Sequence, residues 1–128
     1  METIKILIAE DNAVMRKILR ALLTQRDKEF QIYEAQSGED VERLVEELEI
    51  NWLFLDLYLP NINGDKIVSS IKENSKFDSL DIVMISAETD RSKIVDLLKS
   101  ERIFNYLSKP INKERFQWTI EELLKKSL

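Results

Sequence analysis

Acidic, hydroxyl and basic residues follow four of the short apolar segments of this chain, each where its segment ends. Glu10 and Asp11 follow IKILIA, Asp56 ends WLFLD, Ser86 ends DIVMIS, and Lys109 follows NYLS. Each residue alone has an ordinary explanation: the acids and Ser86 could cap helices or turns, Asp56 could bind loop amides, and Lys109 could be solvated or form a plain ion pair. These explanations are independent of one another, so none of them accounts for the repeated placement.

The chemistry that such residues could perform together is phosphoryl transfer. Two carboxylates ~4 Å apart repel by ~4 kcal/mol at an effective dielectric of ~20, a large share of the ~5–15 kcal/mol that keeps a domain folded. Lys109 supplies one compensating charge, and the remainder suggests a bound divalent cation; an all-oxygen site with few ligands suits Mg²⁺. Mg²⁺ and lysine beside a carboxylate and a hydroxyl can neutralise phosphoryl oxygens. Asp56 is the best candidate for a carboxylate nucleophile that forms an acyl phosphate.

Composition excludes several other functions. The 128 residues include no histidine and no cysteine, which rules out Ser-His-Asp and Cys-His catalysis and zinc sites of the usual ligands. The net charge of −5 and the lack of a basic stripe argue against direct binding to nucleic acid. No apolar run approaches ~20 residues, and the N-terminal segment turns acidic too soon for a signal peptide. We therefore expect no membrane contact and a cytoplasmic location.

The elements that must position these residues alternate between strand and helix. This alternation predicts one α/β domain with a parallel sheet, in which the carboxyl ends of the strands meet at one edge and bind ligands. The expected strands are Ile4–Ala9, Gln31–Ala35, Trp52–Asp56, Asp81–Ser86 and Asn105–Ser108. The expected helices are Ala13–Arg26, Ser37–Leu48 with Ser37 as its N-cap, Gly64–Asn74, Arg91–Ser100 and Asn112–Lys126.

Taken together, these motifs resemble the receiver domain of bacterial two-component response regulators. The resemblance covers essentially the whole chain and rests on LIAEDN, LDLYLPNINGD, MISA and YLSKP, which occur in this order. It implies a flavodoxin-like, doubly wound five-stranded sheet with strand order 2-1-3-4-5 and five helices. It also implies a single receiver domain over residues 1–128, with no output domain in this chain.

The resemblance implies that Asp56 takes a phosphoryl group from the phosphohistidine of a histidine kinase or a histidine phosphotransfer protein. Asp11 and Asp56 then bind Mg²⁺ directly, together with the backbone carbonyl of Tyr58, and Glu10 acts through a water. Such a domain is a signalling switch, and as a catalyst it promotes only its own phosphorylation and dephosphorylation.

The resemblance also implies how the switch works. Ser86 hydrogen-bonds the phosphoryl group, Lys109 ion-pairs with it, and the peptide between Lys109 and Pro110 is cis. Tyr106 matches an aromatic residue whose ring turns inward when Ser86 moves toward the phosphoryl group. The surface of the fourth helix, fifth strand and fifth helix then changes and controls a downstream protein target or output domain.

Two hypotheses concern residues around this switch. Trp118 lies opposite the apolar stripe of the last helix, so we expect Trp118 and Tyr106 to share a partner-binding surface. Tyr58 and Glu88 stand two residues after Asp56 and Ser86 and could control how fast water attacks the acyl phosphate. Asn105 stands where many DNA-binding regulators have an aspartate used in dimer contacts, so we expect a monomer or a weak dimer.

Three alternatives remain open at this point. A flavin or nucleotide binder of the same fold needs a Gly- or Ser/Thr-rich loop after the first strand, where this chain has EDNAVM. An aspartate-dependent phosphohydrolase usually has a second aspartate two residues after the nucleophile, where this chain has Tyr58. A receiver-like interaction module that is never phosphorylated would not need the full set of site residues.

Overall fold

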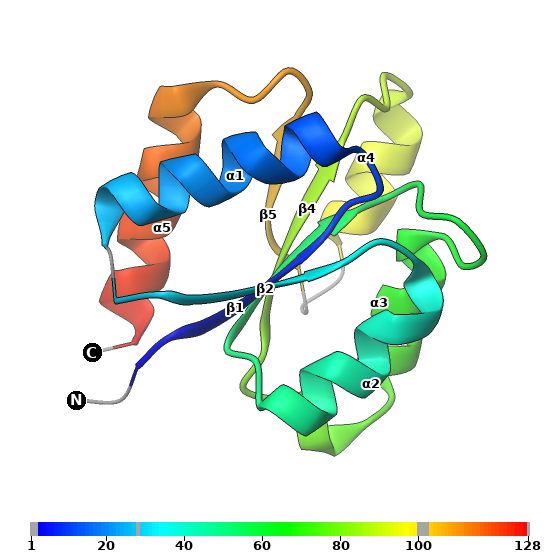
Figure 1. Ribbon diagram of the computed structural model, residues 1–128. Helices are drawn as coiled ribbons and strands as arrows, with labels where there is room; N and C mark the ends of the chain where they lie inside the picture. The colour runs from blue at the N-terminus through cyan, green and yellow to red at the C-terminus, as the bar shows by residue number, and fades with distance from the viewer. Residues whose placement is uncertain (1–2, 28, 100–102, 128) are drawn as a thin grey trace.

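The computed structural model describes residues 3–27, 29–99 and 103–127 (Figure 1). Within these residues, five strands alternate with five α-helices and one short 3₁₀ helix. The strands are β1 Lys5–Ala9, β2 Gln31–Ala35, β3 Trp52–Asp56, β4 Asp81–Ser86 and β5 Ile103–Ser108. The helices are α1 Ala13–Arg26, α2 Gly38–Leu48, α3 Gly64–Lys72, η1 Ser75–Phe77, α4 Arg91–Leu98 and α5 Lys113–Lys126.

All strand pairs are parallel, and the strand order is β2-β1-β3-β4-β5. The predicted doubly wound α/β architecture is therefore confirmed. β1 and β3 lie side by side in the middle, with Ala9 opposite Leu55 at their carboxyl ends. Glu10 and Asp56, which directly follow these two residues, consequently reach the same edge of the sheet.

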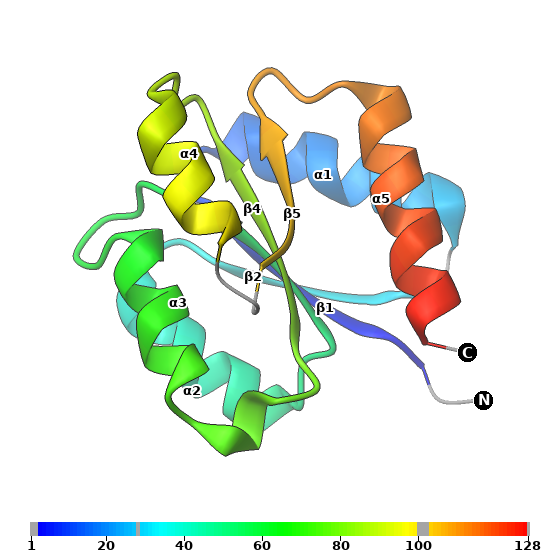
Figure 2. The same cartoon turned by 180° about the vertical axis from the view of Figure 1, so that it is seen from behind.

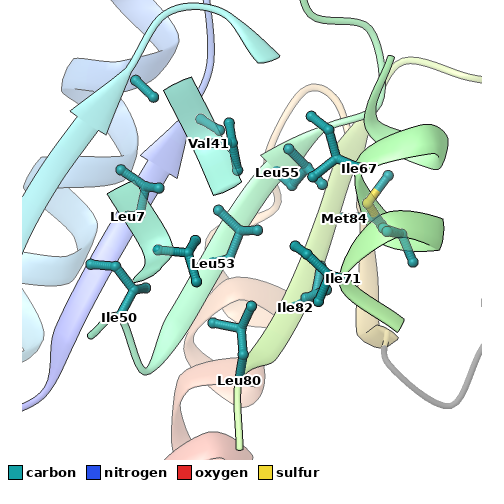
Figure 3. Close-up of a cluster of buried hydrophobic side chains, with 14 of the residues drawn as sticks. Leu7, Val41, Ile50, Leu53, Leu55, Ile67, Ile71, Leu80, Ile82 and Met84 are labelled. Carbon is teal, nitrogen blue, oxygen red and sulfur yellow. The ribbon is translucent and has the colours of Figure 1, made fainter. Parts of the chain in front are cut away.

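Helices cover both faces of the sheet, with α1 and α5 on one face and α2, α3 and α4 on the other (Figures 1 and 2). Alternate residues of β3 enter different cores: Leu53 and Leu55 pack under α2 and α3, whereas Trp52 and Phe54 pack under α1 and α5. Figure 3 shows Leu53 and Leu55 among the side chains of the first cluster. Burial on both faces explains why WLFLD is apolar up to its last residue.

Several predicted boundaries were wrong. β5 begins at Ile103 and not at Asn105, because a register irregularity after Ile103 interrupts the alternation that marks a strand. α3 ends at Lys72 and not at Asn74, whose side chain instead accepts a hydrogen bond from the amide of Lys76 in η1. The predicted end of the fourth helix at Ser100 lies outside the described residues.

The predicted N-cap of the second helix is only half right. Ser37 occupies the N-cap position of α2, but its side chain makes no capping hydrogen bond. The backbone amide of Gly38 instead donates to the carbonyl of Pro60, 3.1 Å away. This contact ties the start of α2 to the loop after β3.

None of the described helices is long and apolar enough to cross a membrane.

Candidate functional site

Three carboxylates converge at the carboxyl edge of the sheet. Glu10 and Asp11 follow β1, Asp56 ends β3, and one oxygen from each lies within 4.8 Å of the others. Glu10 and Asp56 are buried, at 1% and 5% exposure, whereas Asp11 is exposed. The parallel register of β1 and β3 brings the acids together, as the sequence predicted.

Lys109 supplies the positive charge at this cluster. Its Nζ lies 2.7 Å from Glu10 Oε1 and 2.9 Å from Asp56 Oδ2, so one ammonium group pairs with both buried acids. The Lys109 side chain is 21% exposed. The other oxygen of Asp56, Oδ1, accepts a hydrogen bond from the amide of Tyr58 at 3.1 Å. The Asp56 carboxylate is thus held from both sides.

The titration of the cluster reflects this crowding of charge. Burial raises the pKa of Glu10; the Lys109 ammonium opposes that rise, and the neighbouring Asp56 adds to it. Burial alone would lower the pKa of Lys109, but its contacts with Glu10 and Asp56 raise it above the usual value. Both directions follow from the burial of these side chains and from the close contact of Lys109 with the acids.

Ser86 lies at the same edge and is completely buried. Its Oγ accepts a hydrogen bond from the amide of Glu88 at 3.0 Å, and its carbonyl accepts one from the amide of Lys109 at 2.8 Å. The peptide between Lys109 and Pro110 is cis, as the resemblance implied. The hydroxyl and the ammonium are therefore positioned by directly bonded backbones.

Tyr106 of β5 is partly buried and packs against the core under α2 and α3. Its hydroxyl donates to the carbonyl of Glu88 at 3.4 Å. Burial raises the pKa of Tyr106, and interaction with the Ser86 hydroxyl opposes that rise. The side chain of the predicted switch residue is thus partly buried, and its hydroxyl contacts the loop that follows Ser86.

Trp118 is on α5 and is 54% exposed, as predicted from its place opposite the apolar stripe. Both α4 and α5 contact β5, the strand of Tyr106. Asn105 of the same strand uses its side-chain amide to bond Thr119 of α5, at 2.7 Å.

Sequence reasoning missed two charged groups near the site. Arg16 of α1 donates hydrogen bonds to the carbonyls of Glu10 and Asp11 and pairs with Glu34 of β2. Lys93 of α4 pairs with Glu88. Lys93 follows the loop after β4 by a few residues, but the bends of an irregular loop are not readable from the sequence. Arg16 lies one helical turn after Asn12. Its side chain reaches the carbonyls of Glu10 and Asp11 only because of the conformation of the loop between β1 and α1.

The donor set fits a hard divalent cation. The three side chains offer only carboxylate oxygens, which Mg²⁺ prefers over nitrogen and sulfur, and two of them belong to the acid pair at the end of β1. Lys109 is one cation beside three carboxylates, so a divalent cation would offset the negative charge that remains.

Comparison with known proteins gives the same picture. The sequence pattern of the response regulator receiver domain family matches residues 6–121 of this chain. A chemotaxis protein CheY homolog of Campylobacter jejuni is 25% identical over 121 residues, covering 94% of this chain and 92% of that protein. The sensor histidine kinase TmoS of Ectopseudomonas mendocina is 31% identical over 94% of this chain, which spans 12% of the kinase. The sensory transduction protein LytT of Oceanobacillus iheyensis is 31% identical over 95% of this chain, which spans 48% of that protein.

Solved structures share the fold. The signal receiver domain of an HD domain-containing protein from Pseudomonas fluorescens has a TM-score of 0.86 at 18% identity, covering 98% of this chain and 90% of that one. The chemotaxis response regulator CheY4 of Vibrio cholerae has a TM-score of 0.79 at 19% identity, covering 95% and 99%. The family match spans nearly the whole chain, and the chain therefore belongs to the response regulator receiver domain family of two-component signalling systems.

Proposed function

We propose that this domain is a phosphorylation switch in which Asp56 is the phosphoacceptor. A carboxylate oxygen of Asp56 attacks the phosphorus of a phosphohistidine on a histidine kinase or phosphotransfer protein. The new oxygen–phosphorus bond replaces the phosphorus–nitrogen bond, and the imidazole nitrogen leaves with the bonding electrons. The domain would then catalyse only this transfer and the later hydrolysis of its own acyl phosphate.

The contacts of Lys109 support this proposal most directly. Its Nζ bonds Asp56 Oδ2, whereas Asp56 Oδ1 is held by the amide of Tyr58, so the nucleophile is oriented from both sides. After transfer, Lys109 would pair with a phosphoryl oxygen and Ser86 would donate its hydroxyl to another. These are the charge-stabilising contacts on which phosphoryl transfer depends.

Glu10, Asp11 and Asp56 would hold Mg²⁺, together with the backbone carbonyl of Tyr58 and with Glu10 acting through a water. The ion supplies a charge that offsets the phosphoryl oxygens. The chain's own contribution is the oxygen cluster within 4.8 Å and the ammonium of Lys109, which keeps two of the acids from repelling each other before the ion arrives.

The output would be a change in the surface formed by α4, β5 and α5. Tyr106 bonds the carbonyl of Glu88, in the loop directly after Ser86, so a movement of Ser86 toward the phosphoryl group would reach Tyr106 through two residues. Trp118 is exposed on the adjoining helix, and we propose that it joins Tyr106 in one partner-binding surface. Replacing Trp118 with alanine should weaken partner binding in at least one phosphorylation state; unchanged affinity in both states would remove this assignment.

Incubation with Mg²⁺ and acetyl phosphate, followed by intact-mass measurement, tests the central proposal. We expect one phosphoryl adduct on the wild-type chain and none on Asp56→Asn, which keeps the side-chain shape but not the nucleophile. An unmodified wild-type chain at high acetyl phosphate would instead favour an interaction module that works without phosphorylation.

A further inference from the structure

Arg16 connects the loop of the acid pair to the edge strand β2. Its Nη1 donates hydrogen bonds to the backbone carbonyls of Glu10 and Asp11, at 2.8 and 2.9 Å. Its Nε donates to Glu34 Oε1 at 3.1 Å. The Arg16 side chain is only 12% exposed, less than that of Arg20 in the same helix, so this guanidinium is largely enclosed by its partners.

Hydrogen bonds to two successive carbonyls restrict the conformation of the loop backbone more than a single hydrogen bond would. A peptide unit is planar, so a carbonyl held in one direction also fixes the orientation of the plane that contains it. Arg16 holds the planes that follow Glu10 and Asp11, and these planes determine where both side chains leave the loop. The guanidinium can do this because its donors form a rigid fork, and its charge strengthens each bond.

The other hydrogen bonds of this loop restrain Glu10 more than Asp11. The amide of Glu10 bonds the carbonyl of Ala35, and the amide of Asn12 bonds Glu10 Oε2. Both contacts hold the Glu10 side of the loop. Arg16 binds the backbone carbonyl of Asp11, the acid that is exposed and that forms no ion pair with Lys109 in the described part of the chain.

We propose that Arg16, held in place by Glu34, is a positioning residue that aims Glu10 and Asp11 at the divalent cation. This inference rests on the proposed function, because it assigns Arg16 a part in the same metal site. Arg16 itself touches neither the ion nor the phosphoryl group. Its effect passes through the loop backbone, as for groups that orient metal ligands from outside the coordination sphere.

Arg20 is a matched control within the same helix. Its guanidinium also binds Glu34, at 2.7 Å, and it donates to the carbonyl of Ile32 at 3.3 Å. Among the described residues its side chain forms no hydrogen bond with the loop of the acid pair. Arg20→Ala therefore removes an arginine and a Glu34 partner, as Arg16→Ala does, but leaves the carbonyls of Glu10 and Asp11 bonded.

The experiment measures Mg²⁺ binding to the unphosphorylated chain by calorimetry, with thermal unfolding recorded in the absence of metal. We expect Arg16→Ala to weaken Mg²⁺ binding by about ten- to hundredfold, the usual effect of losing a group that orients a metal ligand. Arg16→Lys should fail to restore it, because one ammonium keeps the charge but cannot span two carbonyls and Glu34. Arg20→Ala should bind Mg²⁺ nearly as the wild type does.

Each outcome decides the inference. Wild-type affinity in Arg16→Ala, or equal weakening in Arg16→Ala and Arg20→Ala, would overturn it. Full rescue by Arg16→Lys would also overturn it, because charge alone would then be enough. If Arg16→Ala does not fold, Arg16→Lys carries the comparison. If the wild-type chain itself does not bind Mg²⁺, the proposed function fails and this inference fails with it. If the wild-type chain binds Mg²⁺ and Arg16→Ala binds it equally well, only the inference fails.

Discussion

The hydroxyl of Tyr58 donates a hydrogen bond to the carboxylate of Glu88, thirty residues further along the chain. Tyr58 follows the proposed acceptor Asp56 by two residues, and Glu88 follows Ser86 by two, so the bond joins the loops on either side of the proposed phosphoryl site. Glu88 Oε1 also lies 3.3 Å from Nζ of Lys93 in α4. The loop after β3 is therefore connected to α4 through one carboxylate.

This connection leads us to predict that Tyr58 slows the hydrolysis of the proposed acyl phosphate. Tyr58→Ala removes both the ring and its bond to Glu88, so water should reach the phosphorus more easily. We expect the phosphoryl half-life to fall by about two- to tenfold, the rate equivalent of one hydrogen bond of ~0.5–1.5 kcal/mol. Tyr58→Phe keeps the ring but loses the hydrogen bond, so its phosphoryl half-life should lie between those of the wild type and Tyr58→Ala. An unchanged half-life in Tyr58→Ala would end the assignment of a rate-modulating role to this residue.

Lys109 should contribute more to the free energy of unfolding than an ordinary surface lysine does. Lys109→Met leaves Glu10 and Asp56 buried without their counter-charge, and we expect a loss of about 2–3 kcal/mol, below the ~3–5 kcal/mol of a fully buried pair because the side chain is 21% exposed. Urea denaturation without Mg²⁺ measures it. Lys66→Met, at an exposed position, is the control and should change stability by no more than ~0.5 kcal/mol. Equal effects of the two substitutions would show that the ion pairs contribute nothing.

Asp90 should make the start of α4 sensitive to acid. Its carboxylate accepts bonds from the amide and the hydroxyl of Ser92, which lower the pKa of Asp90 below its usual 3.8. The bonds favour the ionised form, so their contribution is complete above pH 3.8 and is lost as the pH falls through the lowered pKa. Hydrogen exchange of the Ser92 amide should therefore accelerate as the pH falls from 3.8 through the lowered pKa of Asp90.

Asp90→Asn is the control for this titration, because it keeps a side-chain oxygen as the cap but cannot titrate there. The Ser92 amide of this variant should show no such acceleration beyond the ordinary pH dependence of exchange. If wild type and Asp90→Asn respond identically to acid, the cap of α4 does not depend on the charge of Asp90.

Gly64 should tolerate no side chain. A Cβ at this position would lie 2.7 Å from the carbonyl oxygen of Asp56 and 2.9 Å from the Cα of Leu57, both of them backbone atoms that cannot rotate away. Gly64→Ala should destabilise the fold by about 1–3 kcal/mol, the cost of overpacking, and displace the end of β3. Ser70→Ala, on the exposed face of the same helix, should be nearly neutral in the same denaturation measurement. Equal stability of the two variants would contradict the close approach.

Much of this arrangement could be predicted because it depends on periodicity and strand ends. β3 is buried on both faces, so its apolar run and the acid that ends it are both visible in the sequence. Parallel strands expose their carboxyl ends at one edge, so Glu10, Asp56 and Ser86 could be expected to meet there.

What could not be predicted depends on single contacts. Val14 and Ile18 have the helical spacing of core residues, yet they are 66% and 42% exposed. The spacing of apolar residues along a helix does not indicate which of them the sheet covers. The irregular register of β5 at Phe104 hides the start of that strand from alternation. The reach of Arg16 back to the acid pair depends on a loop conformation that residue types alone do not specify.

The order of charges along the chain has a consequence for how the domain is made. Glu10, Asp11 and Asp56 all precede Lys109, which follows the last strand of the sheet. A ribosome releases the N-terminal part first, so the acids emerge well before the ammonium that offsets them. Until β5 pairs with β4, bringing β1 and β3 together also brings unbalanced negative charge together. The arrival of the last strand, and not the pairing of the central ones, is therefore the step at which Lys109 begins to offset the repulsion at this edge of the nascent protein.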